Sequence, residues 1–269
     1  CALPICKREV VVASRAGRVM AFYADGSLVN GWPQTITGHF LTSPVAADLE
    51  GDGIPEIVAA ADDALYVWWP DGTSLPGWPR LGLSGDVGSS PALADLDGDG
   101  DLEILMAGVA SIVYAWHHDG TVVDGWGLAK APVTRSSPVV GDIDGDGDLE
   151  VLLAGDDQDE GVYAWHHDGT PVAGWPRLIP ARDVPQPSWD RRVSPVLTDL
   201  DGDGDVEVGL GVEMQVFFWE TPGRPDCIAW PTFQGSVART GALGILTPLR
   251  PVTLTGQVRD GETWTPIQS

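Results

Sequence analysis

The sequence has little cysteine, few basic residues and no long apolar run, and each shortage excludes a class of protein. Its three cysteines, Cys1, Cys6 and Cys227, are too few and too scattered for a disulfide framework or a zinc site. No run of 18 apolar residues occurs, so we expect no membrane insertion. Against 39 acidic residues there are only 15 lysines and arginines, for a net charge of −24. This balance argues against nucleic acid or anionic membrane as a partner, since both attract basic residues.

Glycine and proline are plentiful by contrast. The 34 glycines and 22 prolines stand between short apolar runs, which is typical of many short strands joined by turns. The hydrophobic content is an ordinary 43 %, so the chain can bury a sizeable core. Its 269 residues fit one large all-β domain or two smaller ones.

An acidic segment of nine residues occurs four times and dominates the sequence. The copies, called loop 1 to loop 4 below, are Asp48–Glu56, Asp95–Glu103, Asp142–Glu150 and Asp199–Glu207. Their first residues are 47, 47 and 57 positions apart, and Glu9 lies 47 positions before Glu56. We therefore predict five repeat units, the first of them partial, at about 7–38, 41–85, 88–131, 135–190 and 192–240.

Each loop lies between short strand-like runs. In the third unit Ala92–Ala94 precedes the loop, the run from Glu103 to Ala107 follows it, and Ile112–Trp116 comes next. The dipeptide Asp119-Gly120 then gives a strong hairpin signal before a Gly-Trp segment. Four antiparallel strands in about 45 residues are typical of a β-propeller blade. We predict an all-β fold, a β-propeller of four-stranded blades with four complete units and one partial unit. A β-sandwich or a β-helix fits this period less well.

Most of the 12 tryptophans recur at matching places in the units. We expect them to pack between blades rather than to bind a ligand. The third strands are expected to carry Trp116, Trp165 and Trp219, and the fourth strands or their approaches Trp32, Trp78, Trp126, Trp175 and Trp230.

The two ends of the chain differ from the repeats. Residues 2–5 match the translation of a sequencing adapter, so we expect residues 1–6 to be non-native and the gene to be a fragment. Residues 241–269 are expected to form a linker and the truncated start of a β-sandwich-like domain. The natural protein would then be longer, and this chain one module of it.

The loops have the composition of calcium sites. Ca²⁺ takes six to eight oxygen ligands, and a tight loop can supply them from alternating positions. Carboxylates occupy positions 1, 3, 5 and 9, position 7 offers its carbonyl, and glycine at position 6 permits a sharp turn. We expect up to four Ca²⁺ ions, with loop 1 the weakest site because it is the least regular. The expected ligands are Asp48, Glu50, Asp52, Ile54 and Glu56; Asp95, Asp97, Asp99, Asp101 and Glu103; Asp142, Asp144, Asp146, Asp148 and Glu150; and Asp199, Asp201, Asp203, Asp205 and Glu207.

Other interpretations of the loops were considered. An EF-hand needs a glutamate at position 12, where this chain has Ala59, Met106, Leu153 and Leu210, and it needs flanking helices. Metal-free turns would crowd four mutually repelling carboxylates into nine residues. The pairs His117-His118 and His166-His167 resemble transition-metal ligands, but their repetition favours a structural role.

The loops resemble those of FG-GAP repeats (integrin-α-type, VCBS-like), over roughly residues 7–240, and the tail resembles that of bacterial secreted members. The resemblance implies a β-propeller with a calcium loop between the first and second strands of each blade. It also implies a secreted or cell-surface location. Seven blades are usual in that family, so this chain is either incomplete or an unusually small propeller.

No catalytic motif is apparent, and we expect a non-catalytic module that binds an unknown protein or glycan. A lectin-like propeller and, further off, a relative of polysaccharide lyases are the alternatives. The ten extra residues before loop 4 fall within 179–192, on the face that should also carry the acidic segment 156–160. This insertion predicts a partner surface, although a tolerated loop is an equal explanation. The candidate partner residues are Arg182, Trp189, Arg191 and Arg192.

Overall fold

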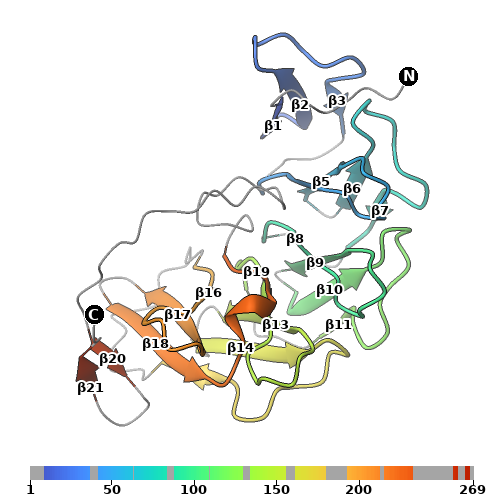
Figure 1. Cartoon of the computed structure of the whole chain (residues 1–269). Coiled ribbons are helices and arrows are strands. Elements are labelled where there is room, and N and C mark those ends of the chain that lie inside the picture. Colours follow the sequence, from blue (N-terminus) through green and yellow to red (C-terminus); the bar gives the residue numbers. More distant parts are fainter. Residues whose placement is uncertain are drawn as a thin grey trace.

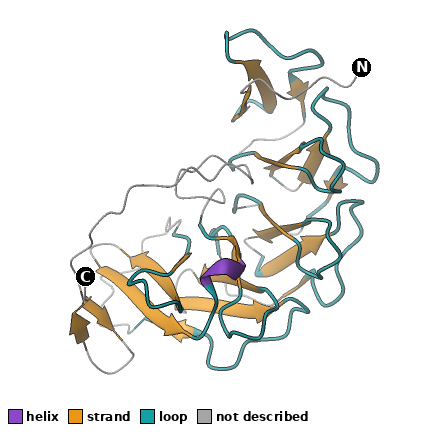
Figure 2. Ribbon diagram, viewed as in Figure 1, coloured by secondary structure: helices purple, strands orange, loops and turns teal. Residues whose placement is uncertain are grey.

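The computed structural model is all-β, as the sequence predicts (Figures 1 and 2). It describes residues 9–36, 42–62, 64–83, 88–108, 110–129, 134–155, 161–179, 193–212, 215–232, 257–259 and 264–266. In these ranges the one helix is the short 3₁₀ turn η3 (Pro225–Cys227). A helix with the length and apolarity for crossing a membrane was not found in this part of the chain.

The strands form five consecutive antiparallel sheets, each built from neighbouring segments of the sequence. The first sheet contains β1 (Glu9–Ser14), β2 (Arg18–Tyr23) and β3 (Gln34–Thr35); the second β4 (Val45–Ala47), β5 (Glu56–Ala61), β6 (Ala64–Trp68) and β7 (Arg80–Leu81); the third β8 (Ala92–Ala94), β9 (Glu103–Gly108), β10 (Ile112–Trp116) and β11 (Leu128–Ala129); the fourth β12 (Val139–Gly141), β13 (Glu150–Gly155), β14 (Gly161–His166) and β15 (Arg177–Leu178); and the fifth β16 (Val196–Thr198), β17 (Val206–Val212) and β18 (Gln215–Thr221). Within the described residues they follow one another in an arc that does not close into a ring (Figure 1).

The second strand of each middle unit is buried on both faces. Every residue of β5, β9 and β13 is buried, and all three strands are six-residue apolar runs that begin with glutamate. A strand with one solvated face would alternate apolar and polar residues, whereas a continuous apolar run fits a sheet covered on both sides. The sheets therefore stack face to face along the chain.

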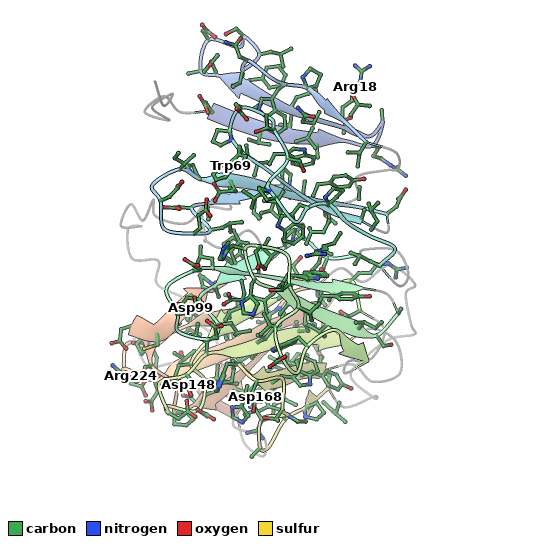
Figure 3. The ribbon with its side chains drawn as sticks, turned by 90° about the vertical axis from the view of Figure 1, so that its right-hand side faces the viewer. Arg18, Trp69, Asp99, Asp148, Asp168 and Arg224 are labelled. Atoms are coloured by element: carbon green, nitrogen blue, oxygen red, sulfur yellow. The ribbon has the colours of Figure 1, made fainter. Side chains whose placement is uncertain are left out.

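The connections fall at two opposite ends of the strands. The acidic loops join the first and second strands, and the Asp-Gly turns follow the third strands at the same end, as expected from antiparallel order. The contact between His118 Nδ1 in a turn and Asp101 Oδ2 in a loop, at 3.1 Å, confirms this. Figure 3 shows the loop residues Asp99 and Asp148 and the turn residue Asp168 toward one end, and Arg18 toward the other.

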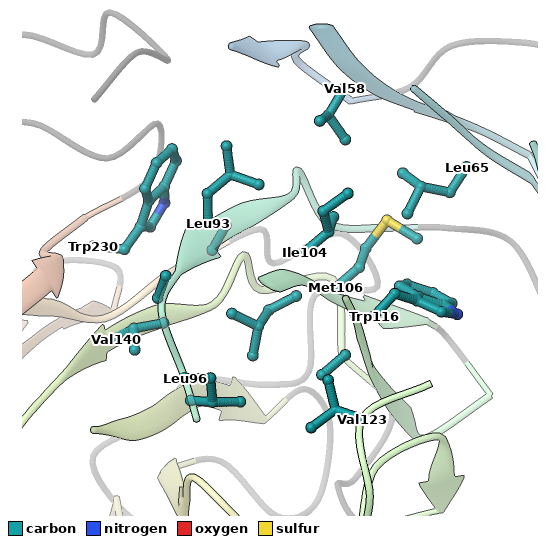
Figure 4. Close-up of a cluster of buried hydrophobic side chains, with 14 of the residues drawn as sticks. Val58, Leu65, Leu93, Leu96, Ile104, Met106, Trp116, Val123, Val140 and Trp230 are labelled. Atoms are coloured by element: carbon teal, nitrogen blue, oxygen red, sulfur yellow. The ribbon is translucent and has the colours of Figure 1, made fainter. Parts of the chain in front are cut away.

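One hydrophobic core runs through the second, third and fourth sheets (Figure 4). Leu65 from β6, Met106 from β9 and Val140 from β12 all belong to it. Tryptophans join successive sheets, since the rings of Trp78 and Trp116 meet edge to face at 6.3 Å. Trp32 with Trp68 and Trp175 with Trp219 make the same contact. For these tryptophans the predicted role in packing between units is confirmed.

The last unit departs from the prediction that Trp230 lies in, or just before, a fourth strand of that unit. The segment β19 (Ile228–Trp230) pairs antiparallel with β12 of the fourth sheet, with Val140 opposite Trp230. A hydrogen bond from Leu197 N to Pro231 O, 2.8 Å long, also ties it to β16. The fifth sheet thus has three described strands, and β19 lies between the first strands of two units. Among the described residues, three sheets contain all four strands of their own unit, where the sequence predicts four.

Two local differences explain this course. The other complete units have an Asp-Gly turn after the third strand, whereas this unit has Pro222-Gly223. They also have glycine before the fourth-strand tryptophan, with φ between 82° and 88° at Gly77, Gly125 and Gly174. Ala229 stands at that place, and alanine rarely adopts such a backbone conformation. The chain instead passes through η3 and extends along β12.

The tail contributes two described strands, β20 (Gln257–Arg259) and β21 (Trp264–Pro266), paired as an antiparallel hairpin. The remainder of residues 241–269 and residues 1–6 lie outside the description. The β-sandwich start and the non-native first residues therefore stay predictions.

Candidate metal sites

The four acidic loops connect the first strand of a unit to its second: β4 to β5, β8 to β9, β12 to β13 and β16 to β17. This is the place that the resemblance to FG-GAP repeats implies. The sheets hold both ends of each loop, because the residues on either side already belong to the β-ladder; Ala47 pairs with Glu56, for example. The loop can therefore close on itself with little freedom left in its backbone.

The first aspartate of each loop folds the loop around its own carboxylate. In loop 3, Asp142 Oδ1 accepts a hydrogen bond from Gly145 N at 2.6 Å, and its Oδ2 accepts one from Gly147 N at 3.2 Å. Loop 4 repeats both bonds at Asp199. The glycine at position 6 has φ of 98° in loop 3 and 99° in loop 4, a region that other residues rarely occupy. Its predicted role in the sharp turn is confirmed.

The last glutamate of each loop hydrogen-bonds back to the start of the same loop. Its Oε2 accepts a hydrogen bond from the backbone N–H at position 2, at 2.5–2.8 Å in all four loops. The four side chains are at most 1 % exposed. Sequence reasoning identified these glutamates as ligands but missed this hydrogen bond, which depends on how the loop folds. The glutamates in question are Glu56, Glu103, Glu150 and Glu207.

Burying a carboxylate without a positive partner is costly. Burial, together with nearby carboxylates, raises the pKa of Glu56, Glu150 and Glu207 to about 7 against the opposing backbone hydrogen bond. Burial also raises the pKa of Glu103. The Oε1 atoms of Glu56 and Glu207 are buried with no hydrogen-bond partner among the described residues. A cation at this place would satisfy these atoms, so the residues fit a bound metal ion.

Three carboxylates converge in each of the first three loops. Oxygen atoms of Glu50, Asp52 and Glu56 lie within 4.8 Å of one another in loop 1. In loops 2 and 3 the carboxylates at positions 1, 3 and 5 do the same. The structure thus brings together three of the predicted ligands in each of these three loops, and ligation itself stays a prediction.

The side chains at position 7 turn toward histidines of the adjacent turn. Asp101 Oδ2 lies 3.1 Å from His118 Nδ1, and Asp148 Oδ2 lies 3.6 Å from His167 Nδ1. This arrangement leaves the backbone carbonyl, rather than the carboxylate, as the ligand that position 7 could offer. The carbonyl was the ligand expected there, including at Ile54, which has no side-chain oxygen.

Two other histidines sit over the last glutamates. His117 Nδ1 lies 3.1 Å from Glu103 Oε1 and 3.8 Å from Asp97 Oδ2. His166 Nδ1 lies 3.2 Å from Glu150 Oε1 and 3.7 Å from Asp144 Oδ2. The sequence showed that these histidines repeat, but only the strand register shows what they face. A structural role is visible in these hydrogen bonds.

The predicted partner residues Arg182, Trp189, Arg191 and Arg192 lie outside the described residues, as does the acidic segment 156–160. The partner surface therefore stays a prediction.

Comparisons with known proteins agree with the repeat. The family model of the FG-GAP-like repeat matches residues 48–106 and 142–210, which include all four loops. These two segments are thus FG-GAP-like repeats. No match was found among curated proteins.

Solved structures share the fold at low sequence identity. The V. cholerae biofilm matrix protein Bap1 superposes with a TM-score of 0.58 at 22 % identity, over 86 % of this chain and 36 % of that one. BBS1N, in its complex with ARL6DN, gives 0.52 at 13 % identity, over 81 % of this chain and 63 % of that one. The chain therefore spans less than two thirds of either structure, and the likeness concerns the fold alone.

Proposed function

We propose that this chain of FG-GAP-like repeats is a calcium-stabilised β-propeller module that binds a protein or cell-surface ligand outside the cell, without catalysis. The observation that carries the proposal is the buried glutamate at the base of every loop. Each one accepts a single backbone hydrogen bond, and in the first three loops three carboxylates converge beside it. In the absence of a cation, four such groups in one chain would oppose folding.

Calcium suits these loops better than other common ions. The donors are hard oxygens from carboxylates and a carbonyl, and Ca²⁺ accepts six to eight of them in irregular geometry. Mg²⁺ demands near-ideal octahedral geometry and keeps several waters. The fold of the loop is set by hydrogen bonds between its own aspartate and glycines, and not by an octahedral set of ligands, which favours Ca²⁺ over Mg²⁺.

The proposed propeller fold and extracellular location rest on further arguments. Consecutive antiparallel sheets with clusters of buried side chains between neighbours are what blades require, and additional sheets would close the arc into a ring. Extracellular modules bind Ca²⁺ with Kd values of about 10⁻⁴–10⁻³ M, which suits a chain that depends on the high calcium outside cells. The loops then act as structural supports, leaving ligand binding to other surfaces.

We place the ligand surface at the face opposite the calcium loops, where the insertion within 179–192 falls in the sequence. Replacing Trp189 and Arg191 by alanine tests this place once a ligand is in hand, and unchanged affinity would remove it. A glycan array separates a lectin-like module, which binds defined sugars, from a module that binds proteins.

The number of bound ions tests the metal proposal directly. We expect equilibrium dialysis of chelator-treated protein against Ca²⁺ to approach four ions per chain. A variant with Glu56→Gln and Glu207→Gln should bind about two fewer, because each change removes the buried charge of one loop. The comparison variant, Glu50→Gln, removes a charge from a more exposed position of loop 1. It should leave the ions of loops 2, 3 and 4 in place. If the protein binds no Ca²⁺ at a saturating concentration, the proposal is wrong.

A further inference from the structure

The four loops differ in the side chain that faces their last glutamate. This position is the end of the third strand, directly across the β-ladder from the glutamate, as for Glu150 with His166 and Glu207 with Glu220. Beside loop 1 this position holds Trp69, which follows Trp68, the partner of Ile57. Beside loop 2 it holds His117, which follows Trp116, the partner of Ile104. Only loop 4, among the four, meets a second acidic side chain there.

Directly opposite residues of an antiparallel pair project from the same face of the sheet, with Cβ atoms about 4.5–5.5 Å apart. Glu207 and Glu220 therefore face each other beside loop 4. Glu207 is 1 % exposed, and its Oε2 accepts the Leu200 N–H. Its Oε1 receives no hydrogen bond from the described residues. In loops 2 and 3 a histidine Nδ1 lies at hydrogen-bond distance from the equivalent oxygen.

An ionised carboxylate cannot donate the missing hydrogen bond. Partial burial raises the pKa of Glu220, a hydrogen bond from the protonated Glu207 carboxyl lowers it, and the charges of Asp201, Asp203 and Asp205 raise it, so Glu220 lies in the field of the whole loop. The nearest described basic side chain in sequence, Arg224, is paired with Asp226 at 2.9 Å. When both glutamates are ionised, the pair has negative neighbours and a buried oxygen without a hydrogen-bond donor, which is the environment that a divalent cation would stabilise.

We propose that Glu220 is an additional ligand of the cation in loop 4 and makes this loop the tightest Ca²⁺ site of the four. The inference rests on the proposed calcium function and extends it to a residue outside the nine-residue segment. Loop 4 would then offer five carboxylates, from Asp199, Asp201, Asp203, Glu207 and Glu220, where the other loops offer four. Ligand charge count is one of the properties that set Ca²⁺ affinity.

A ligand on β18 also has a structural consequence. The loop joins β16 to β17, so a cation bound by Glu220 would connect the third strand to the loop as well. This unit has no fourth strand of its own among the described residues, and β18 is bordered by β17 alone in its sheet. The extra ligand would secure this third strand, whose counterparts β2, β6, β10 and β14 are paired on both sides.

The test is calorimetric Ca²⁺ titration of the full chain after chelator treatment, with Mg²⁺ as the reference ion. The wild-type chain should show one tight site and weaker ones. Glu220→Gln should weaken the tight site on the order of tenfold and leave the weaker sites unchanged. The glutamine amide can donate to Glu207 Oε1, so this variant should fold at least as well as the wild-type chain without calcium.

Reciprocal variants keep the test independent of any folding defect. Glu220→His gives loop 4 the histidine of loops 2 and 3 and should also weaken the tight site. His166→Glu gives loop 3 the carboxylate of loop 4 and should create a second tight site. If calcium binds but neither Glu220→Gln nor His166→Glu changes the affinity or number of the tight sites, the inference is wrong while the calcium function stands. If the wild-type chain binds no Ca²⁺, both are wrong.

Discussion

The indole Nε1 of Trp78 donates a hydrogen bond of 2.8 Å to the carbonyl oxygen of His118, which belongs to the next repeat unit. Trp32 and Trp126 make the same bond to the turns of the units that follow them, at 2.8 and 2.7 Å. The glycine before each tryptophan lies against the Asp-Gly turn of the same neighbour. The Gly-Trp segment of one unit is thus docked on the turn of the next.

This docking predicts that glycine is required before Trp78. A Cβ at Gly77 would lie 2.0 Å from the carbonyl oxygen of Asp119, and φ is 88°. Gly174 has nearly the same φ, 83°, but its nearest neighbour would be Arg177 Nη2 at 3.9 Å. Gly174→Ala should cost about 1–2 kcal/mol for backbone strain. Gly77→Ala should cost about 1–3 kcal/mol more for the clash. Equal losses in denaturant unfolding would show that the docking contact is unimportant.

The hydrogen bond itself makes a separate prediction. Trp78→Phe keeps an aromatic ring near Trp116 but leaves the His118 carbonyl without its donor. We expect the free energy of unfolding to fall by about 1–3 kcal/mol. Trp175→Phe is the matched control, because no indole hydrogen bond to the next unit is found for Trp175 in the described residues. Denaturant midpoints of the two variants give the comparison, and a larger loss for Trp175→Phe would contradict it.

Buried glutamates make the metal-free chain sensitive to pH. The pKa values of Glu56, Glu150 and Glu207 rise from 4.5 to about 7 on burial, so the folded chain holds protons that the unfolded chain has lost. This contribution to stability is complete below pH 4.5 and is lost as the pH rises through about 7. The chelated protein should therefore unfold more easily at about pH 8 than at about pH 5.

Calcium should reverse this dependence. The ion binds the deprotonated carboxylates, so its stabilising effect should grow as pH rises over the same interval, and binding near neutral pH should release protons. Titrations in buffers of different ionisation enthalpy measure the released protons. A calcium effect that does not change between about pH 5 and about pH 8 would argue that the buried glutamates are not ligands.

Glu56→Gln should have opposite effects with and without calcium. In the metal-free chain it removes a buried charge whose Oε1 has no partner and keeps an acceptor for the Leu49 N–H, so stability should rise. In saturating calcium the variant lacks one ligand charge and should gain less stability than the wild-type chain. Glu50→Gln removes a charge from a less buried side chain of the same loop, and its metal-free effect should be smaller. Thermal midpoints in chelator and in calcium measure both effects.

The sequence predicted the parts of this fold that repeat. Strand order, loop position and tryptophan contacts each appear in several units, so the period carries information that one unit alone would not. The place of β19 could not be predicted in this way, because the spacing from Trp219 to Trp230 resembles that of the other units. Ala229 in place of glycine was the available signal.

The site was predictable in composition and less so in its contacts. Alternating carboxylates and glycines identify a loop that can hold a cation, since the ligands are close in sequence. The hydrogen bond from Leu200 N to Glu207, and the position of Glu220 opposite that glutamate, depend on folding and on strand register. A residue 13 positions beyond Glu207 belongs to the site only because β17 and β18 pair in one particular register.

The most direct test of the calcium account is thermal unfolding of the chelator-treated chain as Ca²⁺ is added, with Mg²⁺ in parallel. Calcium selective for the folded state should raise the midpoint continuously, and each site adds about 2.7 kcal/mol at a hundred times its Kd. We expect this rise with Ca²⁺ and little change with Mg²⁺. A folded chain whose midpoint does not respond to calcium would show that the four loops are metal-free turns, and the account would be wrong.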